Sequence, residues 1–149
     1  MSRDQSVTAY LVCRGGAEAI DFYTRAFGAE EVFRMTDPSG DGRIGHAELR
    51  IGGSVIYLAD EYPDFGAISP DTLGGTAVSL HLAVADCDAA TARAEAAGAL
   101  VLRRPATQSF GDRNAVVQDP FGHRWFLGQV VEEMSPEEMQ RRWSAETGA

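Results

Sequence analysis

One order of elements occurs twice in the sequence, and this repeat constrains the fold more than any other feature. The pair Gly28-Ala29 recurs as Gly98-Ala99, and Gly52 recurs as Gly122, each about 70 residues later. A repeat at this spacing indicates two copies of one supersecondary unit. We therefore predict a single domain with module one at residues 7–60, a connector at 61–77, module two at 78–131 and a C-terminal helix at 135–145.

Each module reads as a strand, a helix and three further strands. Apolar alternation predicts the strands, and an apolar stripe that ends at a glycine predicts each helix. The helices are expected at 17–27 and at 87–97, where Asp86 is a candidate N-cap. Ser135, Pro136 and Glu138 form a capping box that starts the C-terminal helix. The strands are expected at 7–13, 31–35, 44–51 and 54–59, and at 78–84, 100–103, 114–118 and 124–130.

The two faces of the predicted strands differ in chemistry. Ala47 and Leu49 alternate with His46 and Glu48, and the other strands show the same division. One face is apolar and suits helix packing, whereas the other mixes polar and aromatic groups, as a ligand pocket does. An ordinary exposed face, or one buried in a dimer, is the alternative. The predicted ligand-binding residues are Tyr10, His46, Glu48, Tyr57, Ser79, His81, Gln118 and Phe126.

The composition excludes several classes of partner. The net charge of −9 and the scattered arginines argue against a nucleic-acid surface. No apolar run approaches the roughly 20 residues that a membrane helix needs, and the first residues carry no apolar signal region, so we expect a cytoplasmic protein. Cys13 and Cys87 lie outside any metal-binding motif and are expected to be reduced, buried thiols.

Several motifs resemble those of one known family. They are AIDFY at residues 19–23, FGA at 27–29, GHAEL at 45–49, HLAVAD at 81–86 and DPFGHRW at 119–125. Their order and spacing are similar to the vicinal oxygen chelate (glyoxalase/bleomycin resistance/extradiol dioxygenase) superfamily, and to its PhnB-like branch in particular. The resemblance spans residues 7–131.

This resemblance implies an α+β fold in which two βαβββ modules form a curved eight-stranded mixed sheet around a cavity. It also implies a homodimer. Members of the superfamily include metal-dependent lyases, isomerases and dioxygenases, together with metal-free proteins that sequester antibiotics. The expected partner is therefore a small organic ligand or substrate.

The resemblance also indicates where a metal would bind. Metal-dependent members place His, Gln or Glu on the first and fourth strands of each module, and these positions correspond here to Thr8, Tyr57, Ser79 and Phe126. Such residues do not form the usual ligand set for a divalent metal. We therefore expect no metal or other cofactor. The alternative is a shifted zinc or iron site made by His46, Glu48 and His81.

Two functions remain open from the sequence. The first is binding of a small organic molecule in the sheet cavity, where a planar or cationic ligand would stack on aromatic side chains. The second is a glyoxalase-like lyase or isomerase, or a dioxygenase, with a shifted metal or a metal-free acid/base site. Its candidate catalytic residues are Glu48 or His81 as the base and Tyr57 or Tyr10 as the hydrogen-bond donor.

Overall fold

The computed structural model describes residues 4–148, which form two compact units. The first unit runs to Thr76 and also includes Pro120–Gly122. The second comprises Ala77–Asp119 and continues from His123. Each unit contains one four-stranded sheet.

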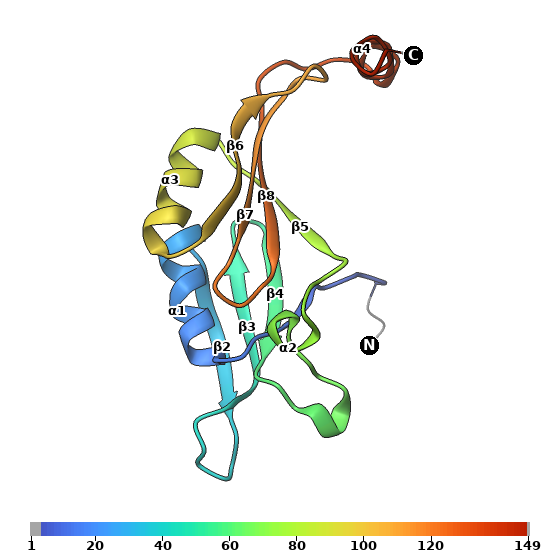
Figure 1. The fold of residues 1–149 in the computed structure, drawn as a ribbon. Coiled ribbons are helices and arrows are strands. Elements are labelled where there is room, and N and C mark those ends of the chain that lie inside the picture. The colour runs from blue at the N-terminus through green and yellow to red at the C-terminus, as the bar shows by residue number, and fades with distance from the viewer. Residues whose placement is uncertain (1–3, 149) are drawn as a thin grey trace. The chain divides into compact units, whose positions relative to one another are not determined.

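The first unit follows the predicted order of elements (Figure 1). Its sheet has the order β1-β4-β3-β2, in which β1 is parallel to β4 and the other pairs are antiparallel. A short 3-10 turn, η1, and a one-turn helix, α2, follow within the connector. The bounds are β1 Tyr10–Val12, α1 Gly16–Phe27, β2 Glu30–Thr36, β3 Ile44–Ile51, β4 Ser54–Ala59, η1 Pro63–Phe65 and α2 Pro70–Leu73.

One face of this sheet packs against α1 (Figure 1). Ala47, Leu49 and Leu58 alternate along β3 and β4 and are fully buried. Phe22 of α1 is also buried, and its ring lies edge-on to that of Phe121, 6.2 Å away between centroids. This packing leaves the opposite residues of β1, β3 and β4 free to form a different surface, as the alternation predicted.

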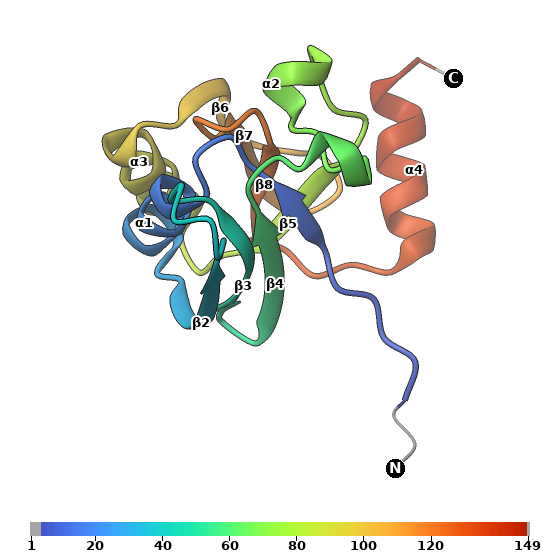
Figure 2. The ribbon, with the colours of Figure 1, turned by 90° about the horizontal axis from the view of Figure 1, so that it is seen from below.

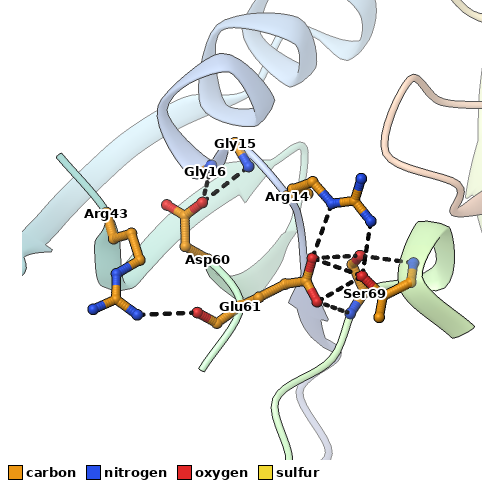
Figure 3. A network of polar contacts seen from close by, with 8 residues as sticks. Arg14, Gly15, Gly16, Arg43, Asp60, Glu61 and Ser69 are labelled. Carbon is orange, nitrogen blue, oxygen red and sulfur yellow. Dashed lines mark hydrogen bonds and ion pairs between the residues drawn. The ribbon is translucent and has the colours of Figure 1, made fainter. Parts of the chain in front are cut away.

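Helix α1 is capped by a residue far away in the sequence. Gly15 precedes the helix with a φ of 100° and has no side chain that could cap it. The Asp60 carboxylate, at the end of β4, acts as the cap instead. Oδ1 of Asp60 accepts from the backbone N–H of Gly15 and of Gly16, both at 2.9 Å (Figure 3). Oδ2 of Asp60 accepts from Ile44 N at 2.7 Å. A negative group at a helix N-terminus is also favoured by the helix dipole.

The second unit repeats the arrangement with the sheet order β5-β8-β7-β6. Ala115, Val117 and Leu127 are fully buried on the face that α3 covers. Asp86 caps α3, because its Oδ1 accepts from Ala89 N at 3.0 Å. The bounds are β5 Ser79–Ala83, α3 Cys87–Ala97, β6 Leu100–Thr107, β7 Asp112–Gln118, β8 Arg124–Val130 and α4 Pro136–Glu146.

The C-terminal helix α4 begins at the predicted capping box, where Ser135 Oγ accepts from Glu138 N at 3.2 Å. None of its residues is buried, and Figure 2 shows it standing apart from α3. Arg142 ties the helix to the segment after β8 through an ion pair with Glu132, and it also pairs with Glu138 one turn earlier in α4. No helix in residues 4–148 is long and apolar enough to cross a membrane.

The predicted fold class is confirmed: the chain is α+β, with two βαβββ modules and a C-terminal helix. Two strand boundaries differ from the predicted ones by more than two residues. Strand β1 begins at Tyr10 rather than at Val7, which is fully exposed on a segment that runs away from the sheet (Figure 2). Strand β6 continues to Thr107 past Pro105, because an edge strand tolerates a residue without an N–H, and its register shifts there.

Candidate functional site

A pocket of about 600 Å³ opens at one end of the first sheet. Its floor is made where β1 and β3 begin, and its walls come from the end of β2 and from the connector. This volume lies within the range that small organic ligands occupy. The lining residues are mostly apolar or aromatic: Tyr10, Val12, Met35, Thr36, Asp37, Pro38, Gly45, His46, Ala59, Tyr62, Phe65, Gly66 and Ala67.

An aromatic cluster forms the floor. The ring of His46 lies 5.4 Å from that of Tyr10 and 4.9 Å from that of Tyr57, and Phe33 approaches it at 5.7 Å. Strand register explains the grouping, because Tyr10 pairs with Tyr57 across β1 and β4, and both side chains leave the face away from α1. Edge-on and tilted rings at these distances attract one another, so the cluster is a preformed surface.

A short polar contact lies within this cluster. The Tyr10 hydroxyl and His46 Nδ1 are hydrogen-bonded at 2.6 Å. When the neutral phenol donates, the imidazole proton resides on Nε2, which makes His46 a donor toward its other side. Burial raises the pKa of Tyr10, and the neighbouring Tyr57 raises it further, so the phenol stays protonated at neutral pH.

A second polar group joins the turn after β2 to the connector. The Tyr62 hydroxyl donates to Asp37 Oδ2 at 2.8 Å, and the guanidinium of Arg43 lies 4.2 Å above the Tyr62 ring. Hydrogen bonds from Ser39 and from Tyr62 lower the pKa of Asp37 to about 2. The same contact with the Asp37 carboxylate raises the pKa of Tyr62. This wall of the pocket therefore holds an ionised carboxylate beside a neutral phenol.

The connector is fixed by Glu61, which follows the helix-capping Asp60 (Figure 3). Its carboxylate accepts from Arg14 Nε at 3.1 Å and from the Ser69 and Thr72 hydroxyls at 3.1 and 2.8 Å. Burial by itself would raise the pKa of Glu61, but the hydrogen bonds from Thr72, Arg14 and Ser69 together lower it. The segment between Glu61 and Ser69 is thus held at both ends, and it carries Tyr62 and Phe65 into the pocket wall.

Large apolar side chains around the opening are exposed. Phe65 is 86% exposed, Met35 58% and Tyr10 50%. Exposed apolar side chains that are gathered in this way favour the binding of a ligand that covers them, because burying apolar surface lowers the free energy. Together with the Tyr10–His46 pair and the Asp37 carboxylate, they suit a flat organic molecule that carries a hydrogen-bonding group.

Four of the predicted ligand-binding residues lie in the first unit. Tyr10 and His46 line the pocket. Tyr57 contacts both rings from below, and Glu48 is its cross-strand neighbour on β3 without lining the pocket. The structure thus brings three of these residues into one cluster and places Glu48 beside it.

The other four lie on the sheet of the second unit. His81 and Phe126 are cross-strand neighbours on β5 and β8. Ser79 and Gln118 both pair with Arg124, one row further along the same sheet. Of the catalytic candidates, His81 therefore belongs to this second group, whereas Glu48 and Tyr57 belong to the first.

The sequence interpretation missed Met35, Asp37, Tyr62 and Phe65. Asp37 lies in a turn and the two aromatic residues lie in the connector, where no alternation shows which side chains face inward. A usable signal was nevertheless present, since two aromatic residues in a Gly- and Pro-rich connector are unusual for a solvated loop.

The positions that the resemblance assigns to metal ligands do not supply a ligand set. Thr8, Tyr57, Ser79 and Phe126 offer hydroxyls and a phenyl ring. Within residues 4–148, no group of three or more His, Cys, Asp or Glu side chains is arranged to hold a metal ion. His46, a member of the alternative set, is engaged at Nδ1 by Tyr10. These residues do not fit the superfamily's metal centre.

Comparison with known proteins was consistent in sequence and in structure. The profile of the Glyoxalase/Bleomycin resistance protein/Dioxygenase superfamily matches residues 6–127. An uncharacterized protein of Mycobacterium bovis is 43% identical over 146 residues, which cover 96% of this chain and 95% of that protein.

Solved structures show the same fold. The crystal structure of an Arabidopsis thaliana gene product superposes with a TM-score of 0.68 at 26% identity, covering 84% of this chain and 98% of that one. The PhnB protein of Bacillus cereus superposes with a TM-score of 0.64 at 20% identity, covering 84% and 99%. At that identity the second match shows similarity of fold alone.

Proposed function

Because the chain belongs to the Glyoxalase/Bleomycin resistance protein/Dioxygenase superfamily, we propose that it binds a small organic molecule in the pocket of the first unit, without the superfamily's usual metal centre. The observation that carries the proposal is the pocket of about 600 Å³ whose aromatic floor contains the Tyr10–His46 hydrogen bond. Aromatic walls with a few convergent polar groups are typical of small-molecule sites.

The ligand class follows from the lining. The pocket offers ring faces and edges to a planar group, from Tyr10, His46 and Phe65. Dispersion and ring stacking with these side chains favour an aromatic ligand. The Asp37 carboxylate is ionised at neutral pH and already lies 3.7 Å from Arg43, so at the wall it offers a hydrogen-bond acceptor to an N–H group rather than an unpaired negative charge. A planar molecule that carries an amine or amidine is therefore the first choice for screening.

Thermal shift with a library of planar aromatic amines tests the proposal, since a ligand that binds the folded state raises its stability. We expect a subset to raise the unfolding temperature. Phe65→Ala should weaken the best compound about tenfold, because it removes one wall from a desolvated contact. Leu73→Ala is the matched control: it is also an exposed apolar residue of the connector, but it does not line the pocket.

The proposal fails if no compound stabilises the protein, or if Leu73→Ala weakens binding as much as Phe65→Ala does. Both side chains are largely exposed, so neither substitution removes a core contact. A difference between the two variants therefore reports on the pocket and not on folding.

A second function, metal-free acid/base catalysis, is favoured by one observation. The 2.6 Å contact between the Tyr10 hydroxyl and His46 Nδ1 places a proton donor and a base side by side at the pocket floor. If the protein is an enzyme, a bound compound is converted, and Tyr10→Phe lowers kcat more than it changes affinity. If it is a binding protein, mass spectrometry recovers the compound unchanged. Metal analysis of the purified protein and of His81→Ala separates both from the shifted-metal alternative.

A further inference from the structure

Most arginines in the described part of the chain form ion pairs, but Arg103 and Arg124 do not. The chain carries 13 basic residues, all of them arginine, and a net charge of −9. Within residues 4–148, Arg103 and Arg124 have no carboxylate within ion-pair distance. The arginines that do form ion pairs are Arg14, Arg25, Arg34, Arg43, Arg50, Arg104, Arg113, Arg141 and Arg142.

The unpaired arginines share the face of the second sheet that is turned away from α3. Arg103 pairs in register with Val116, which pairs with Phe126. Arg124 lies two positions before Phe126 on β8, so both side chains leave the same face. Phe126 therefore has Arg103 across β7 and Arg124 two residues earlier on its own strand, whereas the intervening Trp125 is buried on the other face.

Arg103 is held in place without being neutralised. Its Nη2 donates to Asn114 Oδ1 at 2.7 Å, and its Cζ lies 5.8 Å from the centroid of the Phe126 ring. Asn114 is buried, which makes it a firm anchor. A guanidinium has five N–H donors in a planar fork, and a single amide oxygen leaves most of them available.

His81 completes the row. It pairs in register with Phe126, and its ring lies over Gly128, where a Cβ would come within 2.5 Å of Nε2. Among residues 4–148 its imidazole has no hydrogen-bond partner. Asp112 is the carboxylate on this face of β7, and its register partner Val130 places it at the other end of the strands. The row of side chains from Arg103 to His81 therefore supplies hydrogen-bond donors, and, of the residues described, no carboxylate of this face lies beside it.

We propose that this face of the second sheet binds an organic anion, with a flat apolar part against Phe126 and a carboxylate or phosphoryl group on Arg103. Arg124 and His81 lie on the same face and add donors. A guanidinium fork matches both acid groups, and the Phe126 ring supplies the apolar surface. All the groups involved belong to the second unit, so the inference is independent of the pocket in the first.

Isothermal titration with 2-naphthoate and with 2-naphthyl phosphate at low ionic strength tests this proposal, and the tighter of the two identifies the preferred acid group. Neutral 2-naphthamide is the control ligand. We expect Arg103→Gln to weaken binding of the acids at least tenfold, since it removes a charge-assisted hydrogen bond. Arg104→Gln, the same change one residue along at an arginine paired with Glu95, should change affinity less than twofold.

Three results would overturn the proposal: no difference between acid and amide, equal losses in Arg103→Gln and Arg104→Gln, or full affinity in Arg103→Gln. A thermal scan of each variant verifies folding. If Arg103→Gln does not fold, Arg103→Lys replaces it, because lysine keeps the charge but lacks the planar guanidinium fork. The proposal then requires that Arg103→Lys bind 2-naphthoate more weakly than the Arg104→Lys control does.

Discussion

Asp37 and Tyr62 show how individual side chains shape the pocket. Tyr62 comes from the connector and Asp37 from the turn after β2, and their 2.8 Å hydrogen bond joins two segments that no regular element connects. The low pKa of Asp37, about 2, has Ser39 as its largest cause and Tyr62 as a further one. The carboxylate therefore remains an acceptor throughout the neutral and mildly acidic range.

The pH dependence of this contact has a definite sign. The pKa of Asp37 falls from 3.8 to about 2 on folding, so the ionised form favours the folded state. Its contribution to stability is complete above the higher value and is lost as the pH falls through the lower one. We expect Tyr62→Phe to raise the pKa of Asp37 and Ser39→Ala to raise it more. Carboxyl NMR titrations measure both values; an unchanged pKa in Tyr62→Phe contradicts the hydrogen bond.

The sequence predicted some pocket residues and not others for a physical reason. Tyr10 and His46 lie on strands, where strict alternation assigns each side chain to a face. Tyr62 and Phe65 lie in the connector, where the direction of a side chain depends on local turns such as η1. Alternation cannot assign such residues.

At the scale of elements, α1 depends on Asp60 for its start. The three backbone N–H groups bound by this carboxylate belong to Gly15, Gly16 and Ile44, so one side chain ties the helix to β3 and to the end of β4. Gly16 is needed as well, since a Cβ there would lie 2.6 Å from Asp60 Oδ2. Tertiary caps of this kind leave no local sequence signal, which is why the helix was predicted without one.

Asp60→Ala should lower the free energy of unfolding by about 2–4 kcal/mol, because it leaves three backbone donors without their acceptor. Urea denaturation measures the loss. Asp64→Ala, which removes an exposed carboxylate from the same connector, is the control and should change stability by less than about 0.5 kcal/mol. A loss in Asp60→Ala no larger than in the control would show that α1 has another cap.

Most element boundaries followed from the sequence where the pattern was strong. Strands β3, β4 and β8 and helix α3 have the predicted limits, because alternation, glycines and the Asp86 cap mark them. Strand β6 was predicted to end at Arg103, but it continues to Thr107 past the proline at 105. Its edge position allows the strand to continue with an irregular register.

For the whole molecule, the repeated βαβββ unit has produced two sheets with different side-chain chemistry. The first carries an aromatic floor with the Asp37 carboxylate near it, and the second carries Arg103 and Arg124 around Phe126. The two units thus share one fold, while the free faces of their sheets carry different sets of side chains. The homodimer and the cytoplasmic location stay predictions.

Methionine methyl NMR tests the central claim, that the pocket of the first unit binds a small organic molecule. Met35 lines this pocket, whereas Met139 lies on α4 in the second unit. On titration with a planar aromatic amine that stabilises the protein, the account predicts that the Met35 methyl signal, assigned with Met35→Leu, shifts in a saturable way while the Met139 signal does not move. A stabilising compound that leaves the Met35 signal in place, or that shifts Met139 instead, would contradict it.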